Sequence, residues 1–63
     1  MTPIGLFKTT KMTNRFGHNQ KVYILEDHAN HYKVRYFMRN HKGRMVEGLI
    51  GKDASCIGKI MMF

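Results

Sequence analysis

Apolar and basic side chains alternate over residues 32–39, and this is the clearest pattern in the chain. The even positions are all apolar: Tyr32, Val34, Tyr36 and Met38. The odd positions hold Lys33, Arg35, Phe37 and Arg39. A period of two over about eight residues is typical of a β-strand with one buried face. The segment therefore predicts a half-buried strand whose other face is basic and carries one aromatic ring.

Four further segments have the composition of short strands. They cover residues 4–11, 21–27, 44–50 and 59–63, and a polar loop at 13–20 separates the first two. Asp53 can cap one helical turn that runs through Cys56 before the last strand. Five short strands predict a single all-β domain over residues 1–63. We expect either a small SH3-like barrel or a strongly bent antiparallel meander, because closing the sheet would hide its edge strands.

Two hairpin turns set the expected register. A turn at Ala29-Asn30 places Leu25 opposite Val34, and a turn closed by Gly43 in the left-handed region pairs Asn40 with Arg44. One face then collects Tyr23, Leu25, Val34, Tyr36, Met38, Val46 and Ile50. The opposite face collects Val22, Ile24, Glu26, Lys33, Arg35, Phe37, Arg39, Met45, Glu47 and Leu49. The first face is apolar apart from the tyrosine hydroxyls, which makes it the predicted core.

Basic side chains are in large excess and are unevenly distributed. The chain has 63 residues with 11 Lys and Arg against 4 Asp and Glu, a net charge of +7. Residues 1–25 and 31–44 contain nine of the basic residues and no acid. Such a surface attracts polyanions, although charge also serves simple solubility. Charge alone leaves both interpretations open.

The basic strand face gives the leading candidate site. Cations that contact phosphate, together with a ring that stacks on bases, are what a nucleic-acid-binding sheet needs. The predicted set combines that face with the adjoining turn and the long loop: Arg15, Lys33, Arg35, Phe37, Arg39, Lys42 and Arg44. The alternative is an ordinary solvated face, with Phe37 packed under another segment.

Exposed apolar residues would support a second interpretation. Flexible methionine side chains suit an adaptable protein-binding surface. The residues concerned are Met45, Leu49, Met61, Met62 and Phe63. They would dock on an acidic host protein and inhibit or redirect it, or they would join two copies in a homodimer. In the alternative, the last strand simply fills the core.

Catalysis and metal binding have little support. Glu26 and Asp27 are adjacent, so on a strand they face opposite sides. His28 and His31 have a spacing compatible with metal ligands, but His41 falls at the far end of a strand, about 25 Å away. Cys56 is the only cysteine, so no intramolecular disulfide can form. We expect a non-enzymatic module with no cofactor and no metal.

No secretory signal or membrane-spanning segment is apparent. The longest apolar run covers residues 60–63, far below the ~20 residues that a spanning helix requires. A single thiol favours a reducing compartment. We therefore expect a cytoplasmic protein that does not associate with membranes.

Several short motifs together resemble a known group of proteins. They are the segments 13–17 (TNRFG), 22–26 (VYILE), 32–37 (YKVRYF) and 57–60 (IGKI), with a turn ending in Gly43. This order resembles small uncharacterised β-rich bacteriophage domains that occur alone or beside HNH homing endonucleases and AP2-like modules. The resemblance implies a phage origin, the cytoplasm of an infected host cell, and DNA rather than RNA as the partner. The chain departs from the pattern of these domains at two places: at the turn, which usually carries Thr-Gly, and at Met61, where an Asp is frequent. It has no HNH motif, so the resemblance does not imply nuclease activity.

Overall fold

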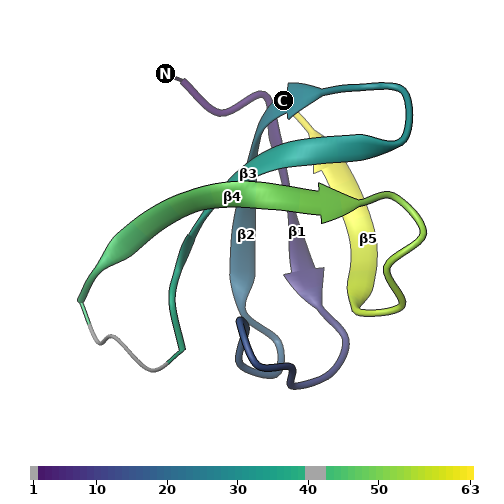
Figure 1. Cartoon of the computed structure of the whole chain (residues 1–63). Coiled ribbons are helices and arrows are strands. Elements are labelled where there is room, and N and C mark those ends of the chain that lie inside the picture. The colour runs from purple at the N-terminus through teal and green to yellow at the C-terminus, as the bar shows by residue number, and fades with distance from the viewer. Residues whose placement is uncertain (1, 40–42) are drawn as a thin grey trace.

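The fold is a single curled sheet of five antiparallel strands (Figure 1). It is seen in a computed structural model that describes residues 2–39 and 43–63. The strands are β1 (Gly5–Thr9), β2 (Lys21–Asp27), β3 (His31–Phe37), β4 (Met45–Gly51) and β5 (Ile57–Met62). Their order in the sheet is β4-β3-β2-β1-β5, so the last strand returns to pair with the first. The predicted all-β fold of five short strands is confirmed.

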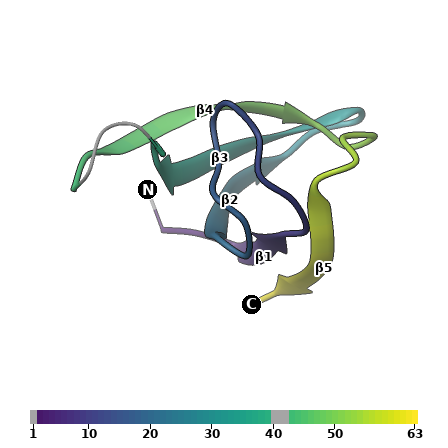
Figure 2. The same ribbon diagram turned by 90° about the horizontal axis from the view of Figure 1, so that it is seen from below.

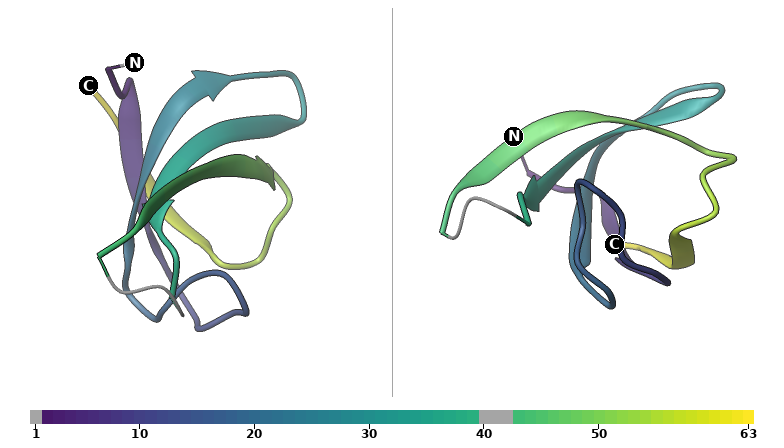
Figure 3. Two further views of the ribbon diagram at one scale, coloured as in Figure 1. Left: turned by 60° about the vertical axis from the view of Figure 1, so that its left-hand side comes forward. Right: turned by 60° about the horizontal axis from the view of Figure 1, so that its bottom comes forward.

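The sheet bends strongly but stays open. β3 and β4 cross the direction of β1 and β2 in Figure 1, and the arch they form is seen from below in Figure 2. No ladder joins β4 to β5 within residues 2–39 and 43–63, so the closure of an SH3-like barrel is not confirmed. The loop between β1 and β2 folds across one end of the arch, as both views in Figure 3 show.

The core lies on the concave side of the sheet and takes residues from four strands and two connections. Its buried members are Phe7, Phe16, Val22, Ile24, Val34, Tyr36, Ile50 and Cys56. Phe16 comes from the loop that the sequence predicts as polar, yet it is only 2% exposed and meets the Tyr36 ring edge-on at 4.7 Å. The loop is held there because Thr13 Oγ1 accepts hydrogen bonds from the backbone amides of Arg15 and Phe16, 3.2 and 3.1 Å away.

A β-bulge at Leu25 changes the predicted register of β2. Glu26 pairs with Lys33, as the predicted turn at Ala29-Asn30 requires. Ile24 then takes the place opposite Val34 that was expected for Leu25, because Leu25 has no partner on β3. A bulge turns the strand over at that point. Val22 and Ile24 therefore point into the core, where both are fully buried, and not to the basic face. Tyr23 moves to the outside. Apolar residues occupy both faces of this segment, so alternation alone could not decide which face is buried.

The β3–β4 pairing differs from the prediction by two residues. Tyr36 lies opposite Val46 and Val34 opposite Gly48. A shift of two keeps every side chain on its predicted face. The connection is longer than predicted, because Met38 donates its amide hydrogen to the Arg44 carbonyl at 3.3 Å. Gly43 has a φ of 75°, in the left-handed region as expected, whereas residues 40–42 lie outside the described part of the chain.

The predicted helical turn before the last strand is not found in the described residues. Two single turns replace it: Ala54 donates to the Gly51 carbonyl at 3.1 Å, and Ile57 donates to the Ala54 carbonyl at 3.3 Å. Cys56 lies inside the second turn, where it is buried and joins the core. β5 therefore begins at Ile57, two residues before the predicted start.

Candidate nucleic-acid interface

The side chains that point away from the core form what we call the outer face of the sheet. It carries Leu6, Lys8, Lys21, Tyr23, Glu26, Lys33, Arg35, Phe37, Met45, Glu47, Leu49, Lys59 and Met61. No pocket opens on the described part of the surface. The candidate site is therefore this exposed face itself.

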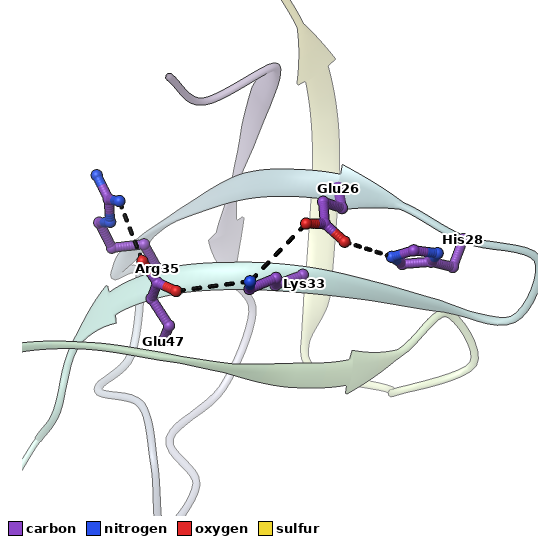
Figure 4. A network of polar contacts seen from close by, with 5 residues as sticks. All are labelled: Glu26, His28, Lys33, Arg35 and Glu47. Carbon is purple, nitrogen blue, oxygen red and sulfur yellow. Dashed lines mark hydrogen bonds and ion pairs between the residues drawn. The ribbon is translucent and has the colours of Figure 1, made fainter. Parts of the chain in front are cut away.

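Two of the predicted phosphate-binding cations on this face are already paired with carboxylates (Figure 4). Lys33 Nζ lies 3.8 Å from a carboxylate oxygen of Glu26 and 3.8 Å from one of Glu47. Arg35 Nη2 donates a hydrogen bond to Glu47 at 3.1 Å. His28 Nε2 lies 2.7 Å from Glu26 at the other end of the network. Cross-strand neighbours on β2, β3 and β4 thus neutralise most of the charge that alternation predicts.

The network lowers the pKa values of its carboxyl groups. The hydrogen bond with His28, followed by the charge of Lys33, holds the pKa of Glu26 below its usual value of 4.5. The hydrogen bond from Arg35, followed by the charge of Lys33, does the same to the pKa of Glu47. At the far end of the sheet Asp27 lies 2.6 Å from Lys52, and this hydrogen bond raises the pKa of the Lys52 ammonium above 10.5.

These pKa shifts predict a loss of stability at both ends of the pH scale. The unfolded chain binds more protons than the native state below about pH 4.5, so the free energy of unfolding falls as these carboxylates protonate. The Lys52 contribution is present below pH 10.5 and is lost as the pH rises through its raised pKa. Urea unfolding at pH 7 and at about pH 3 measures the acid part. Glu47→Gln should reduce the acid loss. Asp53→Asn changes a carboxylate outside the described ion pairs, so it should leave the acid loss of stability unchanged. Equal losses of stability between pH 7 and about pH 3 in both variants would contradict this account.

Three lysines that the sequence interpretation missed lie side by side on β5, β1 and β2. Lys8 is directly opposite Lys21 in the β1–β2 register. Lys59 shares the outer face with Met61 and precedes Ile60, which pairs with Phe7. It therefore lies close to Lys8, at the point where a bulge interrupts the β1–β5 ladder. All three are exposed, and none belongs to an ion pair in the described part of the chain. Like charges directly opposite each other destabilise a sheet, and a bound anion would relieve that repulsion.

An exposed aromatic ring continues this line onto β3. Tyr23 pairs with Arg35, and two residues further along the antiparallel strands this register brings Lys21 beside Phe37. The side-chain amide of Gln20 also donates a hydrogen bond to the Phe37 carbonyl. Phe37 is 49% exposed, and its partner on β4, Met45, is 40% exposed. We call this line the cationic–aromatic row; it consists of Lys59, Lys8, Lys21, Phe37 and Met45. The row crosses all five strands.

Arg15 has a different environment from the one predicted. Its Nε donates to the Tyr36 hydroxyl at 3.0 Å, and its Nη1 donates to the Leu49 carbonyl at 2.9 Å. The guanidinium carbon lies 5.1 Å from the Phe16 ring centre and 5.0 Å from that of Tyr36. A Cβ at Gly48 would come within 2.8 Å of its Nη2. Arg15 therefore ties the β1–β2 loop to β3 and β4.

The remaining predicted cations lie near the β3–β4 connection. Arg39 donates from Nη1 to the Thr13 carbonyl at 3.0 Å, and its side chain is exposed. Arg44 is exposed next to Met45. Lys42 lies outside the described residues. Arg39 and Arg44 thus lie at the same end of β3 and β4 as Phe37. Lys33 lies nearer the other end of β3.

The apolar residues of the alternative site are all exposed. Met45 and Leu49 lie on β4, which is one edge of the sheet, and Met61 and Met62 lie on β5, which is the other. Phe63, at 72% exposure, follows β5. The core contacts of the last strand come from Ile57 and Ile60. The structure therefore leaves two separate apolar edges available.

The histidines do not gather further metal-binding groups. The rings of His28 and His31 stack with centres 4.7 Å apart. Among residues 2–39 and 43–63 no group of three or more His, Cys, Asp or Glu side chains could hold a metal ion. The same residues contain no helix suited to crossing a bilayer.

Comparisons with known proteins found no matching family model, curated protein or solved structure. The resemblance to β-rich phage domains therefore stays a prediction. Any function must be argued from the residues of the outer face.

Proposed function

We propose that this chain is a binding module for nucleic acid, and that the cationic–aromatic row is its contact surface. One observation carries the proposal: Lys59, Lys8 and Lys21 lie side by side with no carboxylate among them and lead directly to an exposed ring. Ammonium groups contact phosphates without regard to sequence, and a neighbouring ring adds base stacking. The protein acts by binding and not by catalysis.

The distribution of the four carboxylates supports this location. Three of them are paired: Glu26 and Asp27 on β2 and Glu47 on β4. Their partners are Lys33 and Arg35 on β3 and Lys52 just after β4. Asp53 lies in the β4–β5 connection. β1, β5 and the loop between β1 and β2 contain no acid. An approaching polyanion therefore meets unopposed positive charge at β5, β1 and the start of β2.

Two matched double variants test the proposal. Lys8→Gln/Lys21→Gln and Lys33→Gln/Lys52→Gln each lower the net charge of +7 by two, but only the first removes unpaired charge from the row. We expect the first pair to weaken oligonucleotide binding about tenfold at low salt. It should also reduce the slope of log K against log salt concentration by about 1.5. Fluorescence anisotropy at several salt concentrations measures both quantities.

The control pair should change the slope far less, because its lysines already have carboxylate partners. Equal effects of the two pairs would mean that net charge alone matters and would contradict a defined site. Unchanged binding in Lys8→Gln/Lys21→Gln would remove the row from the interface. Circular dichroism confirms that each variant is folded.

A second candidate is a protein-interaction module. It is favoured by the exposed Met61, Met62 and Phe63 at the edge of the sheet, close to the positive charge of Lys59. An acidic host protein would be steered by charge and anchored by the apolar side chains. Capture of one acidic host protein that survives nuclease treatment, and is lost in Met61→Lys, supports this candidate. Capture that disappears with nuclease supports nucleic acid.

The finer assignments are proposals of the same kind. We place the curled sheet in the SH3-like class, and the protein in the cytoplasm of a phage-infected cell with DNA as its partner. The return of β5 to β1 supports the first assignment. The other two rest on the motif resemblance and the absence of disulfide-forming cysteine pairs.

A further inference from the structure

Two aromatic rings lie diagonally across β2 and β3 on the outer face. Tyr23 pairs with Arg35, and Phe37 follows two residues later on the same side of β3. Diagonal neighbours of this kind have side-chain origins about 7–8 Å apart, within reach of a common ligand. The bulge at Leu25 creates this arrangement, since without it Tyr23 would point into the core.

Positive charge borders this aromatic pair on two sides. Lys21 precedes Tyr23 on the same face of β2, and the register places it beside Phe37. Arg35 lies directly opposite Tyr23, where its bond to Glu47 holds the guanidinium in place. No other ring of the described residues stacks on Phe37. With 49% of Phe37 exposed, its ring can receive a planar ligand next to a cation.

Only unpaired bases offer a face to such rings. In a duplex the bases are stacked on one another, and a protein on the outside meets phosphates and groove edges. Bases of a single strand can be splayed out and stacked on aromatic side chains of a sheet. The β2–β3 hairpin is also poorly suited to entering a groove, because Glu26 and Asp27 at its end would face phosphates.

We infer that the ligand of the outer face is single-stranded nucleic acid, with bases stacked on Phe37 and Tyr23 and the phosphate backbone following Lys21, Lys8 and Lys59. This inference rests on the proposed function and adds the class of ligand. From β3 to β5 the line spans three strand spacings, about 14 Å. A short oligonucleotide therefore covers it.

The test compares one labelled strand of about ten nucleotides with the duplex made from the same strand and its complement. Fluorescence anisotropy gives both affinities for the wild type, for Phe37→Ala and for Leu49→Ala. Leu49 is a matched control, because it is an exposed apolar side chain on the same face but outside the row. We expect the single strand to bind about tenfold more tightly than the duplex.

Phe37→Ala should lose about tenfold in affinity for the single strand and little for the duplex. Its salt slope should stay at the wild-type value, because no charge is removed, and Leu49→Ala should resemble the wild type in every respect. Equal or tighter duplex binding, or equal behaviour of the two alanine variants, would overturn the single-strand inference while leaving the proposed function in place. Binding of neither probe at low salt would overturn both.

Discussion

Phe16→Ala should leave the chain unfolded or only marginally folded at room temperature. Phe16 is buried against Tyr36 and belongs to the cluster of eight buried residues that forms the core in the described part of the chain. Truncating a buried phenylalanine to alanine costs about 3–5 kcal/mol, since it removes apolar contact and leaves a cavity. A chain of this size has roughly 3–9 kcal/mol of stability in total. The substitution therefore removes a large share of that stability.

Urea unfolding followed by far-ultraviolet circular dichroism measures this loss. Phe37→Ala is the matched control, because it makes the same chemical change at an exposed ring, and it should shift the midpoint little. Phe16→Leu should recover part of the stability by filling the cavity. If Phe16→Ala and Phe37→Ala have similar midpoints, the loop does not cover the core as described.

Arg15→Ala should destabilise the fold by about 2–3 kcal/mol. The substitution removes two hydrogen bonds, to the Tyr36 hydroxyl and the Leu49 carbonyl, and the contacts of the guanidinium with two rings. Hydrogen bonds to charged groups are the stronger kind, and these two connect the loop to two strands. We expect the loop to detach from β4 first, because Gly48 has no side chain of its own to fill the space.

Arg15→Lys separates this role from charge. Lysine keeps the positive charge but cannot make both bonds from one planar group, so most of the stability loss should remain. The salt slope of oligonucleotide binding should stay near that of the wild type. Arg44→Ala, at an exposed arginine, should show no comparable loss in urea unfolding. A lower salt slope in Arg15→Ala with unchanged stability would assign Arg15 to the interface instead.

The strands were predictable because their side-chain patterns are local. The segment at 21–27 has the bounds of β2, and alternation placed Val34 and Tyr36 in the core correctly. The bulge at Leu25 was not predictable, because Val22 and Ile24 are as apolar as Tyr23 and Leu25. Leu25 is buried as predicted, at 3% exposure, but Val22 and Ile24 take the core side that alternation assigned to Tyr23. The burial of Phe16 depends on a core that other strands create, so a polar loop pattern conceals it.

The candidate site was predictable only in part, for a related reason. Charge counted along one strand takes no account of carboxylates on its neighbours, and Glu47 is opposite Arg35 only because of the β3–β4 register. Conversely, Lys8 and Lys59 are far apart in sequence and come together because β5 returns to β1. The bounds 4–11 and 21–27 leave the register between these two segments open, so only the structure places Lys8 opposite Lys21. Phe37 is common to the predicted site and the cationic–aromatic row.

The most direct test of the cationic–aromatic row and Tyr23 as the interface is an NMR titration of the ¹⁵N-labelled chain with a short single-stranded oligonucleotide. We predict that the largest changes in backbone amide shifts fall on Lys8, Lys21, Tyr23, Phe37 and Lys59, with small changes at the β2–β3 hairpin. Changes concentrated at Met61, Met62 and Phe63, or at the paired residues Glu26 and Lys33, would contradict this account.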